Sequence, residues 1–343
     1  MTLAPATSGR SATDQAFGIV VVHRSPSPYL AVCLRQAKLW NPHCPVVLAG
    51  DASNRSMAVD RFIAIDALER TPAHSSFLSD YRHYSPWQSQ DWERFCIERW
   101  FVVLAVMRRE GWDHCLALDS DVLLFCDAAS ESRDSRSAAV VLSRWDAQRA
   151  LPHCTYINQR GALEAFCDHI AATYRSESRL TALKARNQKK LDRYWISDMS
   201  LWQDWAERTS HRVQIRDPLP TAGAAYDSCI ETVEGFQRSN PLPLLVRPWK
   251  RIVFRQGRPL AFRRQDGRPL ALNCVHYHGR FKALMERHAR GRNDGLVAGL
   301  ILLREKLKAY PPKLRRGARG YGEALRRRLR GRSAPAGQPS PRP

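Results

Sequence analysis

The sequence lacks any hydrophobic run long enough to cross a bilayer, and it lacks any Cys-x-x-Cys pair. Apolar runs such as residues 296–303 fall well short of the ~20 residues that a spanning helix needs. The nine cysteines are an odd number with scattered spacing, which argues against a disulfide framework and a zinc site. The first residues carry neither the charged nor the apolar region of a signal peptide. Together these absences predict a cytoplasmic protein in a reducing compartment.

Positive charge is abundant but unevenly distributed. The formal net charge is +21, and residues 304–332 alone hold 12 Lys or Arg against 2 Asp or Glu. No recognisable nucleic-acid-binding module accompanies this charge, so we expect no nucleic-acid partner. We divide the chain into a flexible leader (1–13), a globular domain (14–295) and a basic tail (296–343) with a disordered end.

The start of the tail combines an apolar segment with dense positive charge. Residues 296–303 are too short to span a membrane, but such a segment beside basic residues suits a peripheral anchor on an anionic membrane surface. The alternative is a helix that packs on the domain and leaves a solubilising tail.

Apolar runs alternate with helical patterns in the first third of the chain. Residues 18–22, 45–50 and 61–65 have the composition of buried strands, and residues 29–39 and 91–111 have helical patterns. Asp91 is suited to cap the second helix and Gly111 to end it. This alternation predicts an α/β fold with a mostly parallel open sheet and flanking helices.

The second half of the chain carries weaker patterns. The polar, basic residues 176–194 predict a mobile loop, and residues 195–202 open a further helix. Within residues 254–272 the sequence Gly-Arg-Pro-Leu-Ala occurs twice, and Asp266-Gly267 is typical of a hairpin turn. We expect a small β-hairpin meander that leads into a strand over residues 274–278.

Asp119 and Asp121 stand inside the apolar run of residues 116–125, which has the composition of a buried strand. Carboxylates are rare in such a strand unless they are paired or bind a cation. Side chains two residues apart in an extended segment point the same way, so both could bind one divalent ion together with substrate phosphates. Alternatively, the two acids cap the strand end or pair with an arginine.

Two motifs resemble a known family. The segment Leu118-Asp-Ser-Asp-Val-Leu-Leu-Phe125, after the helix that contains Cys96-Ile-Glu-Arg99-Trp-Phe, resembles nucleotide-sugar glycosyltransferases of the GT-A fold. The segment His276-Tyr-His-Gly279-Arg-Phe-Lys282 resembles the His-x-x-Gly-x-x-Lys signature of glycosyltransferase family 8 and its relatives. The family usually continues with Pro-Trp, where this chain has Ala283-Leu284. The resemblance covers roughly residues 14–290.

The resemblance implies a set of site residues. Asp119, Asp121 and His276 would bind a divalent metal, while Gly279 and Lys282 would contact the donor diphosphate. An imidazole beside two carboxylates suits Mn²⁺ better than Mg²⁺. His278 is the competing third ligand, because it shares a face with His276 if the segment is extended.

Further candidates come from their positions. Ser120 between the two acids, and His23 at the end of an early strand, are expected to contact the donor. Arg24 and Asp51 lie at the same strand ends, the sheet edge that receives nucleotides in such folds.

Arg99 falls within the buried stripe of its predicted helix, which is formed by Trp92, Phe95, Cys96, Val103 and Val106. A buried guanidinium needs an anionic partner, either a core acid such as Asp119 or the donor. Asp198 follows Ser197 at a helix start, where it could cap the helix. In the family that the chain resembles, an acid in this region orients the donor sugar or the acceptor, so Asp198 is also a catalytic candidate.

The sequence thus predicts a metal-dependent glycosyltransferase. It would move a hexose-type sugar from a nucleoside-diphosphate donor to a hydroxyl of a glycan or lipid-linked acceptor, in cell-surface glycan or glycolipid synthesis. One alternative is an anionic-polymer or nucleic-acid binder that acts through the basic tail. Another is a two-metal nucleotidyltransferase, although Gly111-Trp112 stands where one large group of those enzymes has Gly-Ser.

Overall fold

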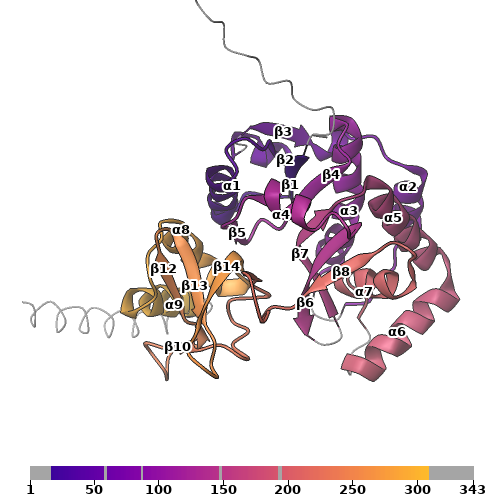
Figure 1. Ribbon diagram of the computed structural model, residues 1–343. Helices are drawn as coiled ribbons and strands as arrows, with labels where there is room; N and C mark the ends of the chain where they lie inside the picture. Colours follow the sequence, from indigo (N-terminus) through magenta and orange to yellow (C-terminus); the bar gives the residue numbers. More distant parts are fainter. Residues whose placement is uncertain (1–16, 58–59, 86–87, 147–148, 192–194, 309–343) are drawn as a thin grey trace, which may run out of the picture.

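A computed structural model describes residues 17–308, apart from 58–59, 86–87, 147–148 and 192–194. The predicted leader (1–13) and residues 309–343 of the basic tail lie outside this range. The described chain contains a seven-stranded sheet and a five-stranded sheet, each with its own helices (Figure 1).

The larger sheet has the strand order β3-β2-β1-β4-β7-β6-β8. Strands β3, β2, β1 and β4 are parallel, as are β6 and β8, whereas β7 runs antiparallel to β4 and β6. The mostly parallel sheet predicted from the sequence is therefore confirmed. Its strands are β1 (Phe17–His23), β2 (Val46–Gly50), β3 (Arg61–Ala64), β4 (His114–Leu118), β6 (Val140–Asp146), β7 (Arg149–Ile157) and β8 (Val213–Arg216).

Helices cover both faces of this sheet, because successive strand side chains point to opposite sides. Ile19 and Val21 of β1 belong to the core that includes α1, whereas Val20 belongs to the core that includes α3, α5 and α7. The helices are α1 (Pro28–Trp40), α2 (Pro72–Asp80), α3 (Gln90–Glu110), α4 (Ala128–Asp134), α5 (Arg160–Arg175), α6 (Glu177–Leu191) and α7 (Asp198–Arg208), with short 3₁₀ helices η1 (Ala52–Met57) and η2 (Ile65–Ala67).

The smaller sheet contains the predicted meander, which is confirmed. Strands β12, β13 and β14 are consecutive and antiparallel, and left-handed glycines at Gly257 and Gly267 turn the chain between them. The elements of this part are β5 (Val122–Leu124), β9 (Ala225–Tyr226), β10 (Arg238–Ser239), β11 (Trp249–Lys250), β12 (Ile252–Arg255), β13 (Arg258–Phe262), β14 (Pro269–His276), η3 (Gly279–Leu284), α8 (Met285–Ala289) and α9 (Leu296–Lys308).

The predicted single strand over residues 116–125 is wrong. The structure has β4 in the larger sheet and β5 in the smaller sheet, joined by a turn that contains Asp119 and Asp121. The backbone N–H of Val122 donates to the Asp119 carbonyl at 3.1 Å, which reverses the chain. The turn keeps two carboxylates out of a continuous buried strand, where both would need charged partners on the same face. Strand β5 then pairs with β14, so the turn connects the two sheets.

The predicted mobile loop over residues 176–194 is also wrong, because residues 177–191 form α6. Lys, Arg, Gln, Ala and Leu dominate this segment and all have high helix propensity. Leu180 and Leu183 are buried, which anchors the helix against the domain. The segment has the composition of a loop because it is mostly polar and charged and buries few apolar side chains, among them Leu180 and Leu183.

Helix α3 differs from its prediction at its first turn. Ser89, one residue before the helix, accepts from the backbone N–H of Trp92 and is the N-cap in place of Asp91. Trp92 is 48% exposed and does not belong to the buried stripe. The helix ends at Gly111 with φ +69°, as predicted.

Helix α9 packs on the domain. Ala298 and Leu302 are fully buried, and a Cβ on Gly299 would lie 2.8 Å from Pro241. Leu296 and Val297 remain partly exposed. None of the helices in the described part is both long and apolar enough to cross a membrane. Anchoring at a membrane surface and the domain limits at residues 13 and 295 stay predictions.

Candidate active site

The turn that carries Asp119, Ser120 and Asp121 lies where β4 leaves the parallel sheet. Strand β1 runs parallel to β4 and ends at the same edge with His23. The Ser120 hydroxyl lies 2.9 Å from His23 Nδ1, and His23 Nε2 lies 3.1 Å from the Ser27 hydroxyl. Burial, assisted by the nearby Lys282 charge, lowers the pKa of His23. The structure therefore places Ser120 and His23 together, with a neutral imidazole favoured.

Asp121 is the centre of a charged cluster. Its Oδ2 lies 2.9 Å from Lys282 Nζ, and its Oδ1 lies 3.6 Å from His276 Nε2. Burial opposes ionisation, but His276 and Lys282 outweigh it and lower the pKa of Asp121. The backbone N–H of Tyr277 donates to the Asp121 carbonyl at 2.9 Å, which ties the end of β14 to the turn. Asp121 is therefore an ionised carboxylate in a nearly enclosed position.

His276 has a defined orientation. Its Nδ1 lies 2.7 Å from the Ser228 carbonyl, which can only accept, so Nδ1 carries a proton. Although burial opposes it, Asp121 raises the pKa of His276. In the neutral ring the free lone pair is on Nε2 and faces Asp121. A backbone carbonyl that fixes the other nitrogen in this way is typical of metal-binding histidines.

Arg99 bridges two acids from different elements. Its guanidinium donates to Asp119 Oδ1, and its Nη2 donates to Asp198 Oδ2 at 2.7 Å. Burial raises the pKa of Asp119 to about 6, with Arg99 opposing and Asp121 adding to the shift. Of the two predicted partners, the structure therefore has Arg99 paired with a core acid.

Asp198 is the first residue of α7, and Ser197 occupies the N-cap position. The Asp198 carboxylate also accepts from the Trp100 indole N–H at 3.4 Å. It is buried and faces Arg99, so the structure brings it into the same group of charges as Asp119.

Replacing Arg99 by Leu should lower the free energy of unfolding by about 3–5 kcal/mol, because it leaves Asp119 and Asp198 without their shared cation. Urea unfolding monitored by circular dichroism measures the change. The Arg99→Lys variant retains one charge and should recover part of the loss. A stability within about 0.5 kcal/mol of wild type in Arg99→Leu would contradict the bridging role.

Gly279 and Lys282 lie on η3, directly after β14. Gly279 has φ +54°, and a Cβ placed there would meet no atom within 4 Å, so its backbone faces open space. Lys282 contacts the Tyr29 hydroxyl at 3.4 Å and lies 4.5 Å from the centre of that ring. Burial opposes the charge of Lys282, but Asp121 raises its pKa, so the ammonium persists.

The remaining candidates lie outside this cluster. Strand β14 ends at His276, so His278 does not share its face; it is exposed and lies 3.1 Å from Glu231. Arg24 pairs with Glu98 at 3.4 Å. Asp51 accepts from the backbone N–H groups of Ser25 and Ser53, so its carboxylate holds the loop after β1.

One supporting pair was not anticipated from the sequence. Lys250 and Asp227 form an ion pair in which both side chains are fully buried. Asp227 Oδ2 also accepts from the backbone N–H of His276 at 3.2 Å, and Lys250 donates to the Cys229 carbonyl at 2.7 Å. The sequence gives no sign that Lys250 is buried, because most lysines are exposed and no pattern around Lys250 distinguishes it from them. The pair fixes the strand end that presents His276.

Asp119, Asp121 and His276 offer two carboxylates and an imidazole with Nε2 free, which suit a divalent cation chemically. Among the described residues, however, no three His, Cys, Asp or Glu side chains are placed to hold a metal together. Arg99 and Lys282 are the present partners of the two carboxylates, while His276 faces Asp121. The assignment of Asp119, Asp121 and His276 as metal ligands stays a prediction.

Compared with known protein families and with curated proteins, the sequence matches none. Solved structures of glycosyltransferases are similar to it. Mouse xyloside xylosyltransferase 1 is 12% identical, with 60% of this chain and 88% of that chain covered and a TM-score of 0.41. The bifunctional glycosyltransferase WbbM is 14% identical over 60% of this chain and 39% of that chain, with a TM-score of 0.34.

The galactosyltransferase LgtC, solved with donor and acceptor sugar analogues, is 11% identical over 58% of this chain and 73% of that chain, with a TM-score of 0.31. Of the bifunctional WbbM, this chain spans well under half of the length. All three proteins are glycosyltransferases, the class that the two motifs resemble.

Proposed function

We propose that the protein transfers a sugar, of the hexose type, from a nucleoside-diphosphate donor to an acceptor hydroxyl. The observation that carries the proposal is the juxtaposition of the Asp119–Asp121 turn with His276 and Lys282. Residues from two distant parts of the sequence, each in a motif typical of such enzymes, meet within hydrogen-bond or ion-pair distance. They meet at the edge of an open α/β sheet, where ligands of such folds bind.

Each residue of the site has a proposed contact with the donor that follows from its charge or its polarity. Lys282 offers an ammonium to the diphosphate, whose negative charge grows as the bond to the sugar breaks. Gly279 leaves its backbone open, so that N–H groups at the start of η3 can approach a phosphate oxygen. His23 and Ser120 form a polar patch beside the acids that can contact the donor. Asp198 is proposed to orient the sugar through its position beside Arg99 and Asp119.

We further propose that a divalent cation, Mn²⁺ rather than Mg²⁺, takes part. Asp119, Asp121 and His276 would hold it, and His276 supplies the nitrogen ligand that favours Mn²⁺. When bound, the ion neutralises charge on the leaving diphosphate. Asp121 would exchange its contact with Lys282 for the ion, which frees the ammonium for the donor.

A panel of sugar nucleotides tests the proposal. We expect one donor to raise the midpoint of thermal unfolding in the presence of Mn²⁺ and to have a smaller effect with EDTA. At a donor concentration 100 times its Kd, binding stabilises the folded state by about 2.7 kcal/mol. Differential scanning fluorimetry measures the shift, and nucleosides without phosphate serve as the control. If no sugar nucleotide shifts the midpoint with any divalent ion, the donor assignment is wrong.

A further inference from the structure

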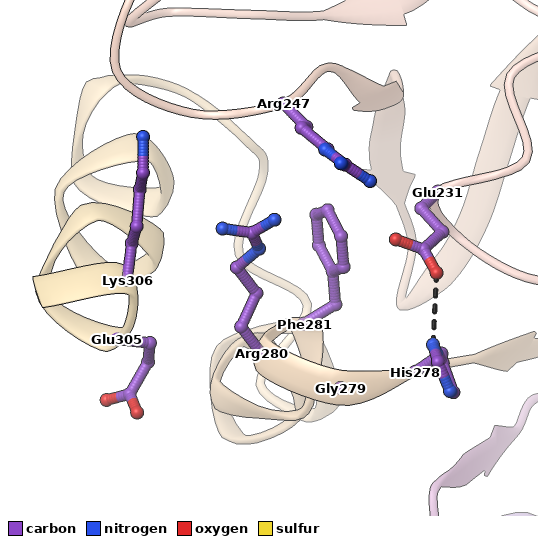
Figure 2. A pocket seen from close by; sticks show the side chains of 8 residues that line it. All are labelled: Glu231, Arg247, His278, Gly279, Arg280, Phe281, Glu305 and Lys306. Atoms are coloured by element: carbon purple, nitrogen blue, oxygen red, sulfur yellow. Dashed lines mark hydrogen bonds and ion pairs between the residues drawn. The ribbon is translucent and has the colours of Figure 1, made fainter. Parts of the chain in front are cut away.

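A cavity lies beside η3, close in sequence to the residues that face Asp121. Its volume is about 590 Å³, within the range of small-molecule sites. Figure 2 shows its lining side chains, which come from η3, α9 and the loops before β10 and β11. They are Glu231, Arg247, His278, Gly279, Arg280, Phe281, Glu305 and Lys306.

The charges of this cavity are unbalanced. Glu231 is paired with His278 at 3.1 Å, and Glu305 is paired with Lys308 at 2.6 Å. The guanidinium groups of Arg247 and Arg280 have no side-chain hydrogen bond or ion pair with any other residue in the described part of the chain. Both arginines lie close enough to Glu231 to help lower its pKa, but no side chain accepts from their N–H donors in the described part of the chain. The cavity thus holds three cations, Arg247, Arg280 and Lys306, against the two acids Glu231 and Glu305.

The arrangement suits an anionic group with several oxygens. In Figure 2 the side chains of Arg247 and Arg280 extend alongside the Phe281 ring from two different segments. Each guanidinium presents a planar fork of N–H donors, which matches the oxygens of a phosphate. Lys306 adds a third positive charge, although its ammonium also donates to the Leu245 carbonyl at 3.0 Å.

The cavity and the acid cluster share one short segment of chain. His276 and Lys282 face Asp121, while His278, Gly279 and Arg280, which lie between them in sequence, line the cavity. The cavity and the proposed reaction centre are thus adjacent along this segment of chain. Gly279 borders both, since its backbone is also proposed for the donor diphosphate, whereas Lys282 does not line the cavity.

We propose that this cavity binds a phosphate group of the acceptor, so that the acceptor is a phosphorylated molecule. The proposal rests on the proposed sugar transfer and adds the chemical class of the acceptor. The phosphate anchors the acceptor through Arg247 and Arg280, and a hydroxyl of the same molecule reaches the acid cluster. The phosphate belongs either to a soluble molecule, which reaches the cavity from solution, or to a lipid headgroup, which is held at a membrane surface.

Calorimetric titration of the full chain with glycerol 3-phosphate tests the cavity, because this molecule carries both a phosphate and free hydroxyls. Vesicles of phosphatidylglycerol, compared with vesicles of phosphatidylcholine, test the lipid source. We expect Arg247→Gln/Arg280→Gln to weaken phosphate binding at least tenfold. A matched control, Arg264→Gln/Arg304→Gln, removes two exposed arginines outside the cavity and should change it less than twofold.

The outcomes separate the two proposals. Binding that is lost only in the cavity variant supports the phosphate site, whether the ligand is the soluble phosphate or the vesicle. No binding of either by wild type, or equal loss in both double variants, overturns it. Stabilisation by sugar nucleotide with Mn²⁺ should be unchanged in the cavity variant, and its absence in wild type would overturn the sugar transfer instead.

Discussion

Replacing Asp121 by Asn is expected to reduce sugar transfer by about 1,000-fold or more while the protein stays folded. Asn preserves the shape of the side chain but removes the charge that holds Lys282 at 2.9 Å and faces His276. Neutralising the leaving diphosphate is worth several kcal/mol in metal-assisted reactions, and each 1.36 kcal/mol is a tenfold change in rate. Steady-state transfer with the donor found by thermal stabilisation measures the loss.

The fold should survive this change. Loss of the Asp121 charge leaves Lys282 without its carboxylate partner and lowers stability, because the pKa of Asp121 is lowered overall in the folded state. Relief of the repulsion between Asp121 and Asp119 offsets part of this loss, and circular dichroism checks that the fold is retained. Asp91→Asn is the matched control, since its side chain is 88% exposed and far in sequence from both motifs. Transfer within tenfold of wild type by Asp121→Asn would show that this carboxylate is not part of the reaction.

Periodic patterns of buried residues predicted the fold well. The first three strands and helices α1 and α3 lie within a few residues of their expected limits, because a buried strand in a parallel sheet must be apolar on both faces. The hairpin meander was predicted because Gly267 can adopt the positive φ that a tight turn needs at no steric cost. These features depend on the types of neighbouring residues, which can be read from the sequence without knowledge of the fold.

Features that depend on distant partners could not be predicted in the same way. Apolar residues on both sides of Asp119 indicated one strand, but only the pairing of β5 with β14 makes residues 122–124 part of another sheet. The orientation of His276 depends on the Ser228 carbonyl, 48 residues earlier in the chain. The stability of the charged helix α6 depends on the burial of Leu180 and Leu183 against distant parts of the domain.

In the candidate site, too, the identity of the residues was predictable from the sequence, whereas their placement was not. Asp119, Asp121, His276 and Lys282 stood out because acids, histidine and lysine occur there with unusual spacing or surroundings. Their mutual placement, and the choice of His276 over His278 as the side chain that faces Asp121, came only from the fold. Tyr29, which contacts Lys282, carries no pattern that a sequence reader could separate from a core tyrosine.

The buried pair of Lys250 and Asp227 is expected to affect stability as strongly as the Arg99 bridge. Lys250→Met retains a similar volume but leaves the Asp227 carboxylate without its cation in a position that water does not reach. Breaking a buried pair by removing one partner costs about 3–5 kcal/mol. We expect urea unfolding to show a loss of this size, with the midpoint moving to lower denaturant.

The double variant Lys250→Met/Asp227→Asn identifies the cause of that loss. Because it removes the uncompensated charge, it should recover a substantial part of the stability, although Asn must still accept the His276 N–H that Asp227 Oδ2 now accepts at 3.2 Å. Lys308→Met is the matched control, since its own side chain is 57% exposed and that of its partner Glu305 is 26% exposed, and pairs that water reaches contribute about 1 kcal/mol or less. If Lys250→Met costs no more than Lys308→Met, the buried pair does not support the His276 strand end. If the double variant is no more stable than Lys250→Met, the cost comes from lost packing and not from the unpaired charge.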